Sequence, residues 1–304
     1  MDVFLELLQL RKKLSHRFAP FSLIDDRFYL QYWYYKVMHR RLNLKQPKTY
    51  TEKLQWLKLY DRNPFYTQLA DKLAVRAYVE EKIGKEYLNP LIGVYNHAEE
   101  IDWQSLPEKF VVKATHGSSW NLICENKDDL NIDKACDMIQ QWISMNFYKS
   151  TQTREWQYRD IPPKIIIEEY IEGAPIYGLL DYKVLCFSGQ AKYIQVHANR
   201  ATDHSKIAFD TQWELLPILN SYSPMPWSIP KPKELDEMLR LAEELSSGIP
   251  FARVDLYYPN EKIIFGEITF FPQGGFRKDF PYEKDLMMGY LIKLPNESGF
   301  KNCI

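Results

Sequence analysis

The chain has 304 residues, of which 45% are apolar and 26% are charged, a balance typical of a globular protein with a sizeable core. Its 39 basic and 40 acidic side chains leave a net charge of −1. It therefore lacks the basic excess that nucleic-acid binding requires, and we expect no nucleic-acid partner. No stretch approaches about 18 consecutive apolar residues, and none of the four cysteines forms a C-x-x-C pair. These features predict a cytoplasmic protein without a transmembrane segment.

The first 65 residues are rich in aromatic side chains and predict mainly helices. Residues 1–18 combine a short apolar run with a basic cluster, which favours a packing helix; peripheral contact with a membrane surface is the alternative. A second helix is predicted to begin at residues 51–53 and to end at Asn63 and Pro64. Helical spacing of apolar residues then predicts one further helix over 65–83, which ends at Gly84.

The next stretch, up to Gly173, predicts four strands and one helix. The strands lie within 88–95, 109–115, 122–126 and 163–173, and the helix follows Asn131 as its N-cap. The second half predicts a hairpin over 179–200, a strand pair over 207–217, a helix over 231–248, and two strands joined at 259–262. We expect an α+β fold, mainly antiparallel in its second half, divided into regions 1–65, 66–108, 109–172 and 173–304.

Two acidic residues stand in the otherwise apolar strands of the last pair. Asp255 and Glu267 can face the same side of the sheet, together with Arg253 and Thr269, because side chains alternate along a strand. Buried carboxylates need a cation or a metal ion as partner. Oxygen ligands next to a guanidinium suit Mg²⁺ that carries phosphate. A structural Arg–Asp ion pair beside an exposed glutamate is the alternative.

Upstream segments supply further candidates for binding an anion. Lys113 ends an apolar strand directly before a turn of small residues, whose backbone N–H groups can form an anion-binding concavity. Glu168 and Glu169 end another apolar strand, where one of them can accept a hydrogen bond from an amino group. Taken singly, a solvated lysine and an exposed edge-strand glutamate are the more common explanations.

Taken together, these stretches resemble the ATP-grasp superfamily, and within it the TupA-like branch associated with bacterial surface polysaccharide and teichuronopeptide synthesis. The resemblance rests on residues 50–76, 110–121, 154–158, 165–173, 181–187, 209–217 and 252–276. It implies ATP held between two α+β subdomains, after an N-terminal helical, aromatic-rich extension. One difference is that Thr269 stands where many members carry asparagine, which leaves open whether one or two metal ions bind.

The resemblance also implies roles for individual residues. Those that would bind ATP are Lys72, Lys113, His116, Gly117, Ser118, Ser119, Glu168, Glu169, Tyr170, Ile171, Asp181 and Lys183. Lys72 and Lys113 would contact phosphates, Glu168 the adenine amino group, and Asp181 the ribose. Asp255, Glu267 and Thr269 would hold Mg²⁺ or Mn²⁺, and Arg253, Lys113 and Lys183 would act in catalysis.

The implied reaction is ATP-dependent ligation of a carboxylate to an amine through an acylphosphate. The expected partners are ATP, a carboxylate-bearing sugar or glycan precursor, and an amine or amino acid. Arg154, Arg200, His204, Gln273 and Gly274 are the candidates for binding these substrates. A sugar kinase on the same fold and a glycosyltransferase of polysaccharide synthesis are the alternatives.

Overall fold

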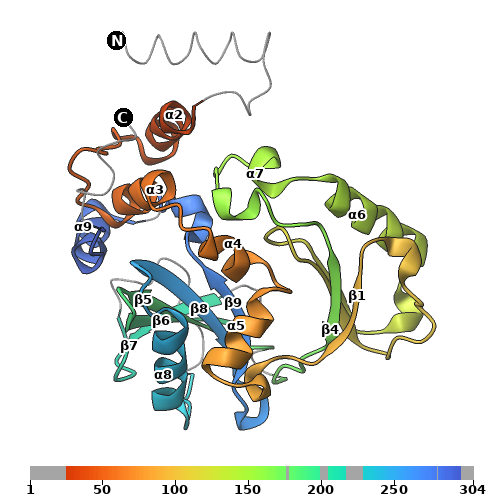
Figure 1. Cartoon of the computed structure of the whole chain (residues 1–304). Coiled ribbons are helices and arrows are strands. Elements are labelled where there is room, and N and C mark those ends of the chain that lie inside the picture. Colours follow the sequence, from red (N-terminus) through yellow and green to blue (C-terminus); the bar gives the residue numbers. More distant parts are fainter. Residues whose placement is uncertain (1–24, 176–177, 199–204, 217–228, 279, 296–304) are drawn as a thin grey trace. The chain divides into compact units, whose positions relative to one another are not determined.

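The computed structural model describes residues 25–175, 178–198, 205–216, 229–278 and 280–295 (Figure 1). Its helices are α2 (Asp26–Met38), α3 (Tyr50–Tyr60), α4 (Phe65–Ala70), α5 (Val75–Lys82), α6 (Ile132–Ser144), α7 (Phe147–Ser150), α8 (Leu235–Leu245) and α9 (Tyr282–Leu291). Its strands are β1 (Leu91–Tyr95), β2 (Phe110–Ala114), β3 (Asn121–Cys124), β4 (Ile165–Glu169), β5 (Asp181–Phe187), β6 (Gln190–Ala198), β7 (Ser205–Asp210), β8 (Phe251–Tyr257) and β9 (Ile264–Thr269). The α+β fold expected from the sequence is confirmed.

The chain forms two compact units, each discontinuous in sequence. Unit 1 is built from the described parts of Met1–Asn63, Tyr148–Trp156 and Phe271–Ile304, and unit 2 from those of Pro64–Phe147 and Gln157–Phe270. The four-region division predicted above stays a prediction.

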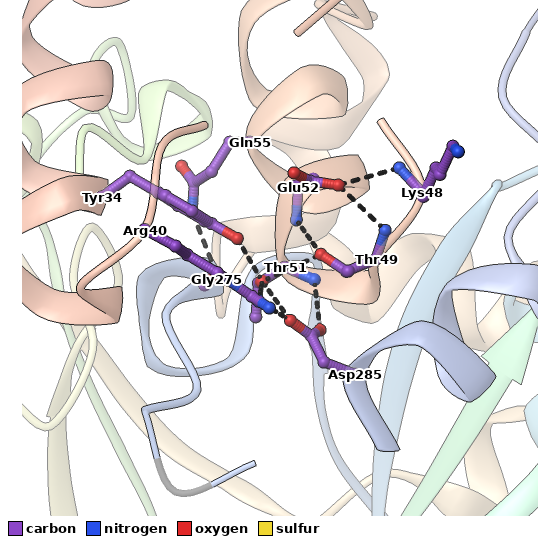
Figure 2. A network of polar contacts seen from close by, with 9 residues as sticks. All are labelled: Tyr34, Arg40, Lys48, Thr49, Thr51, Glu52, Gln55, Gly275 and Asp285. Carbon is purple, nitrogen blue, oxygen red and sulfur yellow. Dashed lines mark hydrogen bonds and ion pairs between the residues drawn. The ribbon is translucent and has the colours of Figure 1, made fainter. Parts of the chain in front are cut away.

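Unit 1 is organised around the N-terminus of α3. Thr49 and Glu52 form a capping box there, in which each side chain bonds the backbone N–H of the other residue. Asp285 of α9 is fully buried and accepts hydrogen bonds from the N–H of Thr51 at 2.8 Å and from its hydroxyl at 2.7 Å. Arg40 also donates to this carboxylate, as Figure 2 shows. The network fixes α3 and α9 to each other although they lie at opposite ends of the chain.

The first sheet of unit 2 is four-stranded and antiparallel, in the order β1-β4-β2-β3. Helix α6 packs on it through Ala135, Ile139 and Trp142, which recur at helical spacing and are buried. Asn131 caps this helix by accepting from the N–H of Lys134, as the sequence predicted. The apolar run of β4 is fully buried, which fixes the register of the strands around it.

The second sheet of unit 2 is five-stranded and antiparallel, in the order β7-β6-β5-β8-β9. Helix α8 lies against this sheet and contacts β5, β6 and β8 (Figure 1). The buried residues of the helix are all apolar. The predicted hairpins are confirmed: β5 turns into β6 at Ser188 and Gly189, and β8 is joined to β9 through a short turn at Pro259–Glu261. None of the described helices is both long and apolar enough to cross a membrane.

The single helix predicted over 65–83 is wrong. The chain forms α4 and α5 with a break at Asp71, whose backbone is extended (ψ 116°). After the break, the N–H of Lys72 donates to the carbonyl of Thr115 at 3.3 Å instead of continuing the helix. The Asp71 side chain accepts from the N–H of Leu73 at 2.8 Å, which starts the next helical segment. The tertiary contact therefore overrides the helical period.

Candidate active site

Two facing strands of the five-stranded sheet carry a compact group of polar side chains. Asp255 on β8 lies opposite Glu267 on β9, and Arg253 lies opposite Thr269. The Arg253 guanidinium donates from Nε to Asp255 Oδ1 at 2.6 Å, and from Nη2 to Asp255 Oδ2 at 2.7 Å. Nη2 also lies 3.0 Å from Glu267 Oε1 and 3.0 Å from the Thr269 hydroxyl. One arginine thus joins the side chains that alternation along the strands placed on one face.

Strand β5 adds Lys183 and Asp181 to this group. Lys183 lies opposite Asp255 on the neighbouring strand. Its ammonium forms an ion pair with Asp255 Oδ2 and lies 2.7 Å from Asp181 Oδ2. Asp255 is only 2% exposed and Lys183 only 4%. Charges buried this deeply are tolerated because each one faces an opposite charge.

The carboxylates of β8 and β9 respond differently to their surroundings. Burial raises the pKa of Asp255 to about 6, against the opposing charges of Arg253 and Lys183. Glu267 is only partly buried; this burial acts to raise its pKa, but the charges of Arg253, Lys72 and Lys183 outweigh it and lower the pKa to about 2. Both groups are therefore charged at neutral pH, and Glu267 is the more firmly ionised.

Lys72 belongs to the same electrostatic environment, although it lies far upstream. Its ammonium donates to the carbonyl of Gly117 in the small-residue turn. Burial lowers the pKa of Lys72, while the charge of Glu267 acts in the opposite direction and that of Lys113 reinforces the lowering. Lys72, Lys113 and Glu267, which are widely separated in sequence, thus lie close enough within unit 2 to act on one another.

On the four-stranded sheet, Lys113 and Glu168 form an ion pair. Glu168 lies opposite Val111, two residues from Lys113 on β2, so the two long side chains meet diagonally at 2.6 Å. Arg76 of α5 donates from Nη1 to the other oxygen of Glu168 at 3.0 Å. The sequence analysis did not single out Arg76. The one feature that pointed to it is its position four residues after Lys72, within the stretch 50–76 that resembles the ATP-grasp superfamily.

The turn after Lys113 has a constrained backbone and one anchoring side chain. Gly117 leaves no room for a side chain, since a Cβ there would lie 2.4 Å from the Trp120 ring. Ser119 adopts a left-handed backbone (φ 63°). His116 is buried, and its Nε2 lies 2.9 Å from the carbonyl of Trp142 near the end of α6. His116 thus anchors the turn to α6, and burial lowers the pKa of its imidazole.

The segment after β4 presents Glu169, Tyr170 and Ile171. The carbonyl of Glu169 accepts from the Asn89 side-chain amide at 2.8 Å, while its side chain is exposed. The hydroxyl of Tyr170 donates to Glu125 at 3.2 Å, and its ring lies under the ammonium of Lys109. The backbone of Tyr170 and Ile171 is the part for which a nucleotide contact was predicted, and this contact stays a prediction.

The predicted substrate residues in the described part of the chain belong to unit 1. Arg154 is 3% exposed; its guanidinium lies 4.4 Å from the centre of the Tyr29 ring and 3.6 Å from Asp26. Gln273 and Gly274 lie in a turn with left-handed backbone angles. The carbonyl of Gly274 accepts from the fully buried ammonium of Lys58 at 2.6 Å. Arg200 and His204 lie outside the described residues.

Of the two carboxylates on β8 and β9, Glu267 fits a divalent cation better than Asp255 does. Glu267 is 37% exposed at its side chain and uses Oε1 for its bonds to Arg253 and Thr269, so its other oxygen can take a metal. Asp255 fits less well, because cations occupy both of its oxygens. Within the described ranges, no group of three His, Cys, Asp or Glu side chains could hold a metal. The donor set therefore suits Mg²⁺ or Mn²⁺ completed by phosphate oxygens and water, and not a cage made by protein alone.

Two antiparallel sheets flanked by helices, with Lys113 on the first and Asp255 and Glu267 on the second, form the arrangement of the ATP-grasp class of fold; Lys72 lies between α4 and α5 and interacts electrostatically with both Lys113 and Glu267. The chain belongs to the family described as TupA-like ATPgrasp, whose profile matches residues 52–293. No curated protein matches it.

Solved structures of several ligases are also similar to this chain. D-alanine–D-alanine ligase from Helicobacter pylori aligns at 14% identity with a TM-score of 0.48, over 80% of this chain and 69% of that one. The D-alanine–D-alanine ligase of Bacillus anthracis aligns at 18% identity with a TM-score of 0.40, over 74% and 63%. Phosphoribosylamine–glycine ligase from Thermotoga maritima aligns at 12% identity with a TM-score of 0.40, over 69% and 51%. The chain thus spans less than two thirds of the length of two of these ligases.

Proposed function

We propose that this protein is an ATP-dependent carboxylate–amine ligase that works through an acylphosphate. The observation that carries the proposal is the set of cations gathered in unit 2. Lys72, Lys113 and Arg253 act on the two carboxylates Glu168 and Glu267. Such a group can bind a triphosphate together with its metal ion.

The residues take these roles in the proposal. Lys72 and Lys113, with the backbone of the turn from His116 to Ser119, bind the phosphates of ATP. Glu168 accepts a hydrogen bond from the adenine amino group. The remaining nucleotide contacts come from Glu169, Tyr170, Ile171, Asp181 and Lys183. Asp255, Glu267 and Thr269 would hold Mg²⁺ or Mn²⁺, which when bound neutralises phosphate charge.

Two bond exchanges make up the reaction. An oxygen of the substrate carboxylate bonds to the γ-phosphorus while the bond to the bridging oxygen of ADP breaks, which gives an acylphosphate. The nitrogen of the amine then bonds to the acyl carbon, phosphate leaves, and the nitrogen loses a proton. Arg253, whose guanidinium bridges Asp255 and Glu267, would stabilise negative charge on the transferred phosphoryl group.

The acid we propose is a uronic acid in a precursor of a bacterial surface polysaccharide, and the partner is an amino acid or another amine. This assignment rests on the branch of the family and on the anion-binding residues proposed above. Arg154, Gln273 and Gly274 would contribute to this substrate site, and Arg200 and His204 are proposed from sequence alone.

The test measures phosphate release from ATP and Mg²⁺ with a panel of uronates, with and without amines. Release that requires both acid and amine, together with an amide product seen by mass spectrometry, supports the ligase. A phosphorylated sugar formed without amine points to the kinase, and consumption of a nucleotide sugar points to the transferase.

Matched variants assign the activity to the site. Lys113→Met and Glu267→Gln are expected to lower turnover at least about 100-fold, since each removes a charge that acts on the phosphates or the metal. Lys233→Met and Glu261→Gln are the controls, because these two residues form an exposed ion pair with each other away from the proposed site residues. Unchanged turnover in both site variants contradicts the proposed function.

A further inference from the structure

Glu168 is a buried carboxylate held by two cations from different elements. It is 6% exposed; Arg76 of α5 lies 3.0 Å from Oε1 and Lys113 of β2 lies 2.6 Å from Oε2. A single salt bridge would already neutralise it, so the second cation leaves an excess of positive charge at this place. This excess of positive charge would attract the negatively charged triphosphate of a nucleotide.

Lys113 and Arg76 are not equivalent partners. Lys113 has a flexible stem and its side chain is 24% exposed, so it can move to another anion. Arg76 is fixed at two points, because its second terminal nitrogen donates to the carbonyl of Asn89 at 2.8 Å. The Asn89 side chain in turn donates to the carbonyl of Glu169 at 2.8 Å, which ties the same group to the end of β4.

We propose that Arg76 is a positioning residue, which holds Glu168 in the orientation that recognises adenine while Lys113 transfers from Glu168 to the phosphates. This inference rests on the proposed binding of ATP. A buried carboxylate left without a cation is very costly, so without Arg76 Lys113 has to stay on Glu168. Arg76 thereby couples recognition of the base to release of the phosphate-binding lysine.

Lysine cannot replace Arg76 in this role. A guanidinium offers parallel donors in a rigid fork and so reaches Glu168 and the Asn89 carbonyl together, whereas an ammonium is a single point on a flexible stem. Arg76→Lys therefore keeps the charge but loses one of the two attachments. We expect its preference for ATP over ITP to lie between that of the wild type and that of Arg76→Met.

The experiment measures the dissociation constants of MgATP and MgITP by calorimetry for the wild type and for Arg76→Met, Arg76→Lys and Glu168→Gln. ITP carries an oxygen in place of the adenine amino group. A hydrogen bond to a charged group corresponds to a preference for ATP of roughly 10- to 100-fold in the wild type. Arg76→Met is expected to lose most of this preference and to weaken ATP binding about 10-fold. In the Glu168→Gln background, Arg76→Met is expected to change the ratio no further.

Arg240→Met is the matched control, because Arg240 forms exposed ion pairs with Glu237 and Glu244 on α8. Circular dichroism and unfolding midpoints establish that each variant is folded, and Arg76→Lys carries the test if Arg76→Met is not. A wild type that binds neither nucleotide contradicts both the proposed function and this inference. A wild type that prefers ATP, with variants of Arg76 that keep the same ratio, contradicts the inference alone, and so does a wild type that binds ATP and ITP equally.

Discussion

Asp285 offers the sharpest test of what holds unit 1 together. It is fully buried and accepts hydrogen bonds from the N–H and hydroxyl of Thr51 and from Arg40 (Figure 2). In Asp285→Asn, one carboxylate oxygen becomes an NH₂ group. If the remaining oxygen keeps the bond to the N–H of Thr51, the NH₂ faces the Thr51 hydroxyl and the Arg40 guanidinium, which both donate in the wild type.

The expected cost follows from the contacts that are lost. Removing one partner of a buried ion pair typically costs about 3–5 kcal/mol. Arg40 keeps 24% of its side chain exposed, so water compensates part of the loss, and the lower end of this range applies. We expect Asp285→Asn to lower the free energy of unfolding of unit 1 by about 3 kcal/mol.

Urea unfolding followed by tryptophan fluorescence and circular dichroism measures this loss. Glu283→Gln, an exposed substitution on the same helix, is the control and should be neutral. Arg40→Met in the Asp285→Asn background removes the unpaired cation, so the double variant should be more stable than the sum of the single effects by at least about 1 kcal/mol. A loss below about 1 kcal/mol in Asp285→Asn, or strict additivity, would refute the reasoning.

Three further predictions concern unit 1. Burial lowers the pKa of Lys58 from 10.5 to about 7, so between these pH values the unfolded chain binds more protons than the folded one. Stability should therefore rise with pH in this window, by up to about 1.4 kcal/mol per unit, and Lys58→Met should remove this slope in unfolding measured from pH 7 to pH 9. Gly289→Ala would place a Cβ 2.1 Å from the carbonyl oxygen of Lys48, so we expect the free energy of unfolding in urea to fall by roughly 2 kcal/mol. In an isolated helix the same substitution would raise stability by about 1 kcal/mol, because alanine has the higher helix propensity. Thr49→Ala removes the N-cap of α3 and should cost about 1 kcal/mol in the same assay; no loss would exclude a capping role.

The features that the sequence predicted well depend on local patterns. Alternation along β8 and β9 is enough to place Arg253, Asp255, Glu267 and Thr269 on one face, and their side chains do meet there. The cap at Asn131 is likewise set by neighbouring residues. The catalytic and metal-binding roles of the residues on β8 and β9 stay predictions.

What the sequence could not predict depends on contacts between distant segments. Apolar spacing continues through Asp71, and only the bond from Lys72 to Thr115 shows why the helix breaks there. Arg76 resembles any charged residue on an amphipathic helix, since its partner Glu168 lies 92 positions further along the chain. Similarly, the ion pair between Lys183 and Asp255 can be predicted only once β5 is known to lie beside β8 in the sheet.

The bond between Thr51 and Asp285 has a consequence for synthesis on the ribosome, because the two residues are 234 positions apart. At about 5–20 residues per second, α3 waits roughly 10–50 s after it emerges before its partner Asp285 on α9 exists. During that interval Leu54 and Leu57, which end up buried, have no finished core to enter. Unit 2 is complete in sequence at Phe270, before α9 has been synthesised, so it can fold while α3 still lacks its contact with Asp285.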